Sequence, residues 1–160
     1  MTADRRRASM RAVLVERAGV EVRDLRCPTL DDVPALGELL YRAYRGTIDD
    51  AGETQEQAVG EIEKTYRGDY GPFDSAHSSV AERSGRLVSA TLITRWQGRP
   101  FVAFTMTDPR HARQGLARAT LTRSMELLQR DGESERRLVV TLENGPARAL
   151  YESLSFTFER

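Results

Sequence analysis

The chain has 160 residues, of which 39% are hydrophobic and 30% are charged. This composition is typical of one folded domain, and it excludes an intrinsically disordered chain. Basic and acidic residues number 24 each, so the formal net charge is zero. A nucleic-acid-binding surface needs a basic excess, and we therefore expect no nucleic-acid partner. No apolar run approaches the roughly 18 residues of a membrane-spanning helix, so no membrane association is expected either.

The N-terminus is basic and lacks the apolar segment of a signal peptide. We interpret residues 1–11 as a flexible, solvated tail and residues 12–160 as a single domain. The only cysteine, Cys27, can form neither an internal disulfide nor a zinc cluster, which is consistent with a reducing cytoplasm. The two histidines are distant from each other and have no clustered carboxylates nearby, so no metal site is expected.

The first half of the chain predicts two strands and two helices. An apolar run over residues 12–15 and an alternating pattern over residues 20–25 are typical of strands. A helix-start signature at residues 29–32 precedes apolar residues at helical spacing, which predicts a helix to about residue 45. A second helical pattern covers residues 53–66.

The second half predicts mainly strands, with two helices late in the chain. The expected elements are strands over 79–83, 86–95 and 99–106, a helix from Gly115 to about residue 130, a strand over 138–142, a helix over 146–154 and a strand over 156–158. Hairpins combined with late crossover helices predict an α/β fold of the α+β type. Its sheet is mixed and mostly antiparallel, with helices on both faces.

The segment Thr-Asp-Pro-Arg-His-Ala-Arg-Gln-Gly-Leu-Ala, residues 107–117, lies between a predicted strand and a predicted helix. Backbone N–H groups at a helix start converge on one point, where the helix dipole is also positive. Gly115 would let the backbone approach a phosphate closely. The segment therefore favours a pyrophosphate site, although a simple helix N-cap explains this loop equally well when it is considered alone.

A second segment, Asn-Gly-Pro-Ala-Arg-Ala-Leu-Tyr, occupies residues 144–151 and begins the helix predicted over 146–154. Pro146 stands at a favoured first helical position, and Asn144 lies at the mouth of the helix. A tyrosine at helical spacing, such as Tyr151, is by itself more typical of core packing than of catalysis.

Together the two segments resemble the GCN5-related N-acetyltransferases (GNAT). The phosphate loop of that family reads Arg or Gln, two residues, Gly, one residue, and Gly or Ala. Gly115 and Ala117 match the two small positions, whereas Ala112 stands where Arg or Gln is usual. The family also has an Asn, an Ala three residues later and a Leu-Tyr pair, which Asn144 and the residues after it match. The Gly that usually follows this helix is Ser155 here.

The resemblance implies that the cofactor is acetyl-CoA or another acyl-CoA. Its pantetheine arm would lie between the strands predicted over 99–106 and 138–142, which splay apart in this family. The residues implied in cofactor binding are Thr107, Asp108, Pro109, Ala112, Arg113, Gln114, Gly115, Leu116, Ala117, Asn144, Ala147 and Tyr151.

The implied reaction is direct attack of a neutral amine on the thioester carbonyl. Tyr151 would protonate the leaving thiolate as general acid, and backbone N–H groups at residues 105–107 would stabilise the oxyanion. The identity of the general base is left open, because the strand over 99–106 contains no carboxylate. Candidates are Glu143, Glu82, Asp108 or a chain of water molecules.

The acceptor would meet the region over residues 41–73, which is rich in acidic and aromatic side chains. We expect Tyr41, Tyr44, Tyr70 and Phe73 to shape an acceptor pocket, and the acids to attract a cationic amine. The acceptor is then an amine on a small molecule or on a peptide or protein. The alternative is a non-catalytic acyl-CoA-binding sensor or partner-binding module, which Ala112 favours.

The two ends of the chain depart from the family pattern. The last family strand is missing after Phe156, and an extra strand over residues 12–15 precedes the usual first strand. Our hypothesis is that the N-terminal strand fills the vacant sheet position, as in a circular permutation, and covers a bare sheet edge. The alternative, an edge left open for a partner, favours a homodimer.

Overall fold

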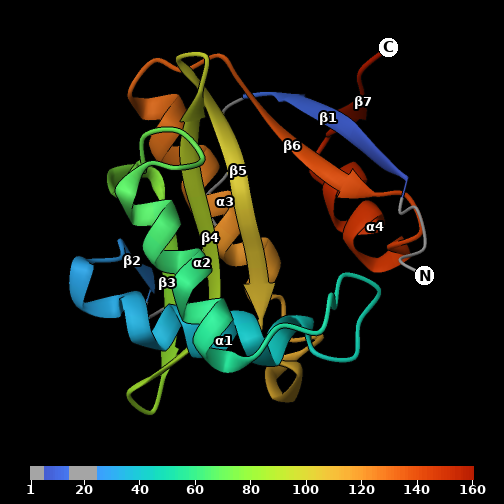
Figure 1. Ribbon diagram of the computed structural model, residues 1–160. Coiled ribbons are helices and arrows are strands. Elements are labelled where there is room, and N and C mark those ends of the chain that lie inside the picture. The colour runs from blue at the N-terminus through green and yellow to red at the C-terminus, as the bar shows by residue number, and fades with distance from the viewer. Residues whose placement is uncertain (1–5, 15–24) are drawn as a thin grey trace.

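The computed structural model describes residues 6–14 and 25–160 of the chain (Figure 1). Within these residues, seven strands form one sheet in the order β2-β3-β4-β5-β6-β1-β7. The pairs are antiparallel except for β5 with β6. The predicted mixed, mostly antiparallel sheet with helices on both faces is therefore confirmed.

The elements of the first half are two strands, a 3-10 turn and two helices. Their bounds are β1 (Arg7–Val13), β2 (Leu25–Arg26), η1 (Leu30–Asp32), α1 (Val33–Tyr44) and α2 (Gln55–Arg67). Both helices lie close to their predicted ranges. In α2, Thr54 accepts a hydrogen bond from the backbone N–H of Gln57, and Gly68 ends the helix in the left-handed conformation.

The second half alternates 3-10 turns, strands and helices. Its elements are η2 (Ser75–His77), β3 (Ser79–Arg83), β4 (Arg86–Trp96), β5 (Arg99–Thr107), η3 (Pro109–His111), α3 (Leu116–Arg130), β6 (Glu135–Thr141), α4 (Gly145–Ser153) and β7 (Thr157–Phe158). Each predicted element is present, and β6 begins three residues before its predicted start at residue 138.

The prediction for the N-terminus was wrong in one respect. We expected a flexible tail over residues 1–11, but residues 7–11 belong to β1. The strand forms there because Met10 and Ala12 alternate with polar residues and bury their side chains in the core. Residues 1–5 lie outside the described residues, as do Val15 and residues 20–24 of the strand predicted over 20–25.

Strand β1 fills the position between β6 and β7. It pairs antiparallel with β6 over seven residues, from Arg7 opposite Thr141 to Val13 opposite Glu135. On its other side it pairs with β7, where Met10 lies opposite Phe158. The predicted pairing of the N-terminal strand with the strand at the other end of the chain is therefore confirmed. The two ends of the described chain meet in adjacent strands (Figure 1).

The sheet separates two hydrophobic cores. One contains apolar side chains of α3, α4 and the inner face of β1, among them Met10, Leu121 and Phe156. The other packs α1 and α2 against β3, β4 and β5, with Leu36 and Ile62 fully buried. Alternate residues of each strand therefore face different helices.

Strands β5 and β6 run parallel and then separate (Figure 1). Their ladder contains one residue pair, Phe101 with Arg137. Strand β5 also carries a bulge, because Leu92 of β4 pairs with Phe104 whereas Ile93 pairs with Val102, which leaves Ala103 as the extra residue. Beyond this single pair, the facing edges of β5 and β6 are free to bind an extended ligand or peptide.

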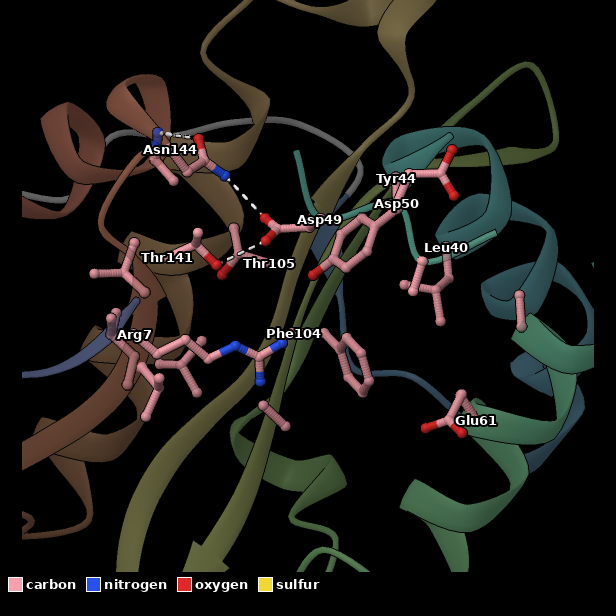
Figure 2. Close-up of a pocket in the computed structure, with 18 of the residues that line it drawn as sticks. Arg7, Leu40, Tyr44, Asp49, Asp50, Glu61, Phe104, Thr105, Thr141 and Asn144 are labelled. Carbon is pink, nitrogen blue, oxygen red and sulfur yellow. Dashed lines mark hydrogen bonds between the residues drawn. The ribbon is translucent and has the colours of Figure 1, made fainter. Parts of the chain in front are cut away.

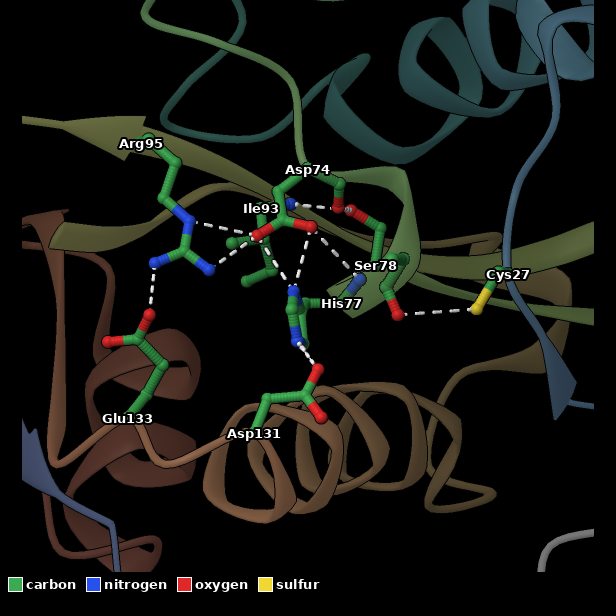
Figure 3. Close-up of polar contacts among 9 residues, drawn as sticks. Cys27, Asp74, His77, Ser78, Ile93, Arg95, Asp131 and Glu133 are labelled. Carbon is green, nitrogen blue, oxygen red and sulfur yellow. Dashed lines mark hydrogen bonds and ion pairs between the residues drawn. The ribbon is translucent and has the colours of Figure 1, made fainter. Parts of the chain in front are cut away.

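A polar cluster holds η2 against β4 and the end of α3 (Figure 3). The ring nitrogens of His77 lie 2.8 Å from the Asp74 carboxylate and 2.6 Å from that of Asp131. Arg95 donates to Asp74 at 2.9 Å and also pairs with Glu133. These contacts give His77 a structural role away from the opening between β5 and β6.

In the part of the chain that the structure describes, the helices are too short or too polar to cross a membrane.

Candidate active site

A cavity of about 560 Å³ opens where β5 and β6 separate (Figure 2). Its walls come from β5, β6, α1, α2, the start of α4, the first residue of β1 and the loop between α1 and α2. Aromatic side chains and charges of both signs face this space. It is the place where two strands, both helical layers and the N-terminal strand meet.

Tyr151 of α4 lies in the wall of the cavity and is buried. Burial raises the pKa of its phenol, and the nearby Thr105 hydroxyl opposes that shift. The phenol of Tyr44, which enters from α1, also has a raised pKa because of its burial. Both phenols therefore keep their protons at neutral pH, and either can donate one.

Asp49, in the loop between α1 and α2, is fixed on the cavity wall by two hydrogen bonds. The hydroxyl of Thr141 donates to its Oδ1 at 2.7 Å, and the side-chain amide of Asn144 donates to its Oδ2 at 3.0 Å (Figure 2). The negative charge of Asp49 contributes to the raised pKa values of both Tyr44 and Tyr151. Asp49 is thus a carboxylate placed close to both phenols.

The predicted phosphate loop connects η3 to α3. Arg113 and Gly115 both have positive φ, at 63° and 76°, and α3 begins at Leu116. Among the described residues, no backbone carbonyl accepts a hydrogen bond from the N–H groups of residues 113–117. These donors lie at the positive end of a 15-residue helix, which suits the binding of a pyrophosphate.

The residues before that loop are held by ion pairing. Asp108 is buried, accepts from the backbone N–H of Arg110 and pairs with Arg42 of α1 at 3.0 Å. Burial acts to raise the pKa of Asp108, but the Arg110 hydrogen bond and the Arg42 charge outweigh it and hold the pKa below its usual value. Asp108 therefore anchors the end of β5 as a carboxylate already engaged with a cation.

The other two candidate bases from the sequence lie on the surface. Glu143 is exposed, and its carboxylate lies 3.4 Å from Arg6 Nε, outside the cavity wall. Glu82 pairs with Arg26 and lies on β3, which β4 and β5 separate from β6 in the sheet. Neither carboxylate is brought to Tyr151.

The structure separates the four predicted acceptor-pocket aromatics into two pairs. Tyr41 and Tyr44 line the cavity. Tyr70 lies outside it and donates to Glu61, while Phe73 packs on Tyr66 with ring centroids 4.3 Å apart. The helical spacing of Tyr41 and Tyr44 was enough to predict that both face the cavity. Tyr70 and Phe73 lie in a loop, where spacing does not indicate the direction of a side chain.

Sequence reasoning did not place two charged residues, Asp49 and Arg7, in the wall of the cavity. Asp49 was one of several loop acids with nothing to single it out. Arg7 was assigned to a flexible tail, yet it stands at the start of β1 and its side chain enters the cavity (Figure 2). The apolar alternation at Met10 and Ala12 could have revealed the strand, but only the sheet pairing reveals where Arg7 points.

The sequence model of the acetyltransferase (GNAT) family matches residues 36–156, which is three quarters of the chain. The chain therefore belongs to the GNAT family, whose members are acyl-CoA-dependent N-acetyltransferases. No curated protein matches the sequence.

Solved structures of acetyltransferases share the fold at low sequence identity. The ribosomal-protein-S18-alanine N-acetyltransferase from Escherichia coli has 21% identity and a TM-score of 0.63, covering 81% of this chain and 74% of its own. The PaiA N-acetyltransferase from Thermoplasma acidophilum, in complex with coenzyme A, has 13% identity and a TM-score of 0.64, covering 82% and 87%. An aminoglycoside 6′-N-acetyltransferase from Acinetobacter haemolyticus has 14% identity and a TM-score of 0.62, covering 86% and 93%.

Proposed function

We propose that the protein transfers an acetyl group from acetyl-CoA to a primary amine by direct attack. The observation that carries this proposal is the buried phenol of Tyr151 in the wall of a cavity between two separated parallel strands.

The chain offers a matching surface for coenzyme A. The free edges of β5 and β6 suit a pantetheine arm with its amides, because that arm can hydrogen-bond like an added strand. The N–H groups of residues 113–117 suit the pyrophosphate. The cofactor supplies an acyl group activated as a thioester, and the similarity to the PaiA acetyltransferase in complex with coenzyme A supports this choice.

Protein residues take part in two proton transfers, one from the amine and one to the leaving sulfur. In our proposal Asp49, rather than Glu143, faces the amine and accepts its proton, since Asp49 lines the cavity and Glu143 does not. The new C–N bond forms as the C–S bond breaks, and Tyr151 donates its proton to the leaving sulfur. Backbone N–H groups around the β5 bulge at Ala103 are the proposed donors to the developing oxyanion.

Asn144 has a different part in this proposal from the one that the family resemblance implied. Its Oδ1 accepts the backbone N–H of Ala147 and so caps α4, while its Nδ2 holds Asp49. We propose that it positions the base and helix α4, and that it contacts the cofactor arm only through the helix it caps.

The test is release of free thiol from acetyl-CoA with a panel of primary amines, amino acids and peptides. Tyr151→Phe should lower kcat at least about tenfold with little change in cofactor affinity. Tyr66→Phe is the matched control, because its phenol lies outside the cavity and donates to the backbone carbonyl of Thr29, and it should retain wild-type turnover. Tight coenzyme A binding without turnover of any amine would overturn the proposal in favour of an acyl-CoA-binding module.

A further inference from the structure

Arg7 brings a positive charge into the cavity from β1, the strand between β6 and β7. It is the first residue of β1 and pairs with Thr141 of β6, so the two side chains share one face of the sheet. Thr141 reaches Asp49 from that face. Figure 2 shows the Arg7 side chain extending along the cavity toward Phe104, below the contact between Thr141 and Asp49.

Among the described residues, no carboxylate lies within ion-pair distance of the Arg7 guanidinium, whereas Arg6 pairs with Glu143 and Arg11 pairs with Glu135. Its charge acts on the phenol of Tyr44 across the cavity, where it lowers the pKa of that group against the dominant effect of burial. Arg7 is therefore a cation presented to whatever occupies the space.

The cavity also carries acidic side chains. Asp49, Asp50 and Glu53 line it from the loop between α1 and α2, and Glu61 lines it from α2, while Arg45 at the start of that loop donates to the Tyr41 hydroxyl. A cavity lined by several acids and by the guanidinium of Arg7 matches a molecule that carries both an ammonium and a carboxylate. An arginine fork binds a carboxylate through two parallel hydrogen bonds, which fixes its orientation.

We propose that Arg7 binds the carboxylate of the acceptor, so that the acceptor is a free amino acid or a close analogue of one. This inference rests on the proposed function and specifies its substrate class. The amine enters on the Asp49 side as an ammonium, loses one proton to solvent to become the neutral nucleophile, and gives a second proton to Asp49 as the C–N bond forms, while Arg7 holds the carboxylate. A polyamine or an aminoglycoside would instead bring a further positive charge against Arg7.

The experiment compares amino acids with their carboxamides in the thiol-release assay. Each pair has nearly the same shape, and only the acid form carries the negative charge. The wild-type protein should show kcat/KM about 10- to 100-fold higher for the acid of its preferred pair, the range expected for hydrogen bonds to a charged group. The amine of a carboxamide is less basic and more often neutral, so a preference for the acid cannot come from amine reactivity.

The variant Arg7→Met should reduce that preference to less than about threefold, mainly by raising KM for the acid, and should leave KM for acetyl-CoA unchanged. Arg11→Met is the matched control. Arg11 lies on the same strand and the same face, pairs with Glu135 and is absent from the cavity wall, so this variant should keep the full preference. Thermal unfolding of both variants shows whether β1 is intact, and Arg7→Lys, which retains the charge, should keep part of the preference.

The outcomes separate the two proposals. Equal loss of activity toward acid and amide in Arg7→Met, or a raised KM for acetyl-CoA, would overturn the inference, as would wild-type turnover that favours amides, polyamines or peptides. In those cases the acetyltransferase reaction itself stands. Failure of every amine to release thiol would overturn the proposed function and this inference with it.

Discussion

The side-chain amide of Asn144 donates a hydrogen bond to the Asp49 carboxylate at 3.0 Å, which ties the start of α4 to the loop between α1 and α2. The two residues come from opposite helical layers and are 95 positions apart in the sequence. The same carboxylate accepts from Thr141 at 2.7 Å. This bridge fixes the one loop acid whose charge acts on both cavity phenols.

If Asp49 is the base, Asp49→Asn should lower kcat by about a hundredfold, within the range for loss of a general base. The amide can still accept from Thr141, so the fold should be retained. Glu143→Gln serves as control and should leave kcat within about twofold, because Glu143 lies outside the cavity. Steady-state kinetics of both variants decides the assignment, and a larger defect in Glu143→Gln would reverse it.

Gly115 should prove necessary for cofactor binding. Its φ of 76° strains any other residue, so Gly115→Ala should cost about 1 kcal/mol of stability and lower coenzyme A affinity about tenfold by shifting the loop N–H groups. Gly132→Ala, after the other end of α3, carries the same strain with φ of 86°. It should cost similar stability, measured by urea unfolding, with unchanged affinity in calorimetry. Equal affinity losses would show that the effect is not local to the loop.

Strand β1 should contribute to global stability rather than lie loosely on the sheet. Met10 is fully buried between β6 and β7, so Met10→Ala should cost about 2–4 kcal/mol. Val13, on the same strand, is 57% exposed, and Val13→Ala should change stability by less than about 0.5 kcal/mol. Deletion of residues 1–16 should lower thermal stability and solubility by baring the edge of β6. Unchanged stability after that deletion would show that β1 is dispensable.

The ion pair between Arg26 and Asp32 should make stability depend on acid pH. Two hydrogen bonds join them, at 2.7 and 2.8 Å, and the hydrogen bonding by Arg26 is the largest cause that lowers the pKa of the Asp32 carboxyl. Because the folded pKa lies below the unfolded one, the stabilisation is present above about pH 4 and is lost as the pH falls through the folded value.

Asp32→Asn should therefore cost about 1 kcal/mol at neutral pH, a figure reduced for the partial exposure of Arg26, and the difference from wild type should shrink as the pH falls below about 4. Urea unfolding across this pH range measures it. Asp31→Asn, at the exposed neighbouring position, should change stability by less than about 0.5 kcal/mol at any pH. A pH-independent loss in Asp32→Asn would attribute the effect to the turn and not to the charge.

Local patterns in the sequence were enough to predict most of the elements. The helix-start signature before α1, the Ser84-Gly85 turn between β3 and β4, and Gly115 before α3 each depend on neighbouring residues alone. The pairing of the N-terminal strand could also be predicted, because a bare sheet edge needs another strand to cover it.

The site was harder to predict because its parts meet only after folding. Asp49 resembles its neighbours Asp50 and Glu53 in sequence, and its distinction is the pair of donors on β6 and α4. Arg7 resembles two adjacent arginines, and its distinction is the register that sets it opposite Thr141. A one-residue shift in that register would turn the side chain to the other face of the sheet.

Strands β5 and β6 share a single residue pair, Phe101 with Arg137, so the sheet consists of two halves joined at one point. In the free protein, those amide protons of residues 104–107 that point away from β4 have no partner strand among the described residues and should exchange rapidly with solvent. A bound cofactor arm would supply those missing hydrogen bonds and slow the exchange across the opening. Ligand binding would then stabilise the fold as well as fill the site, because it joins the two halves of the sheet into one cooperative unit.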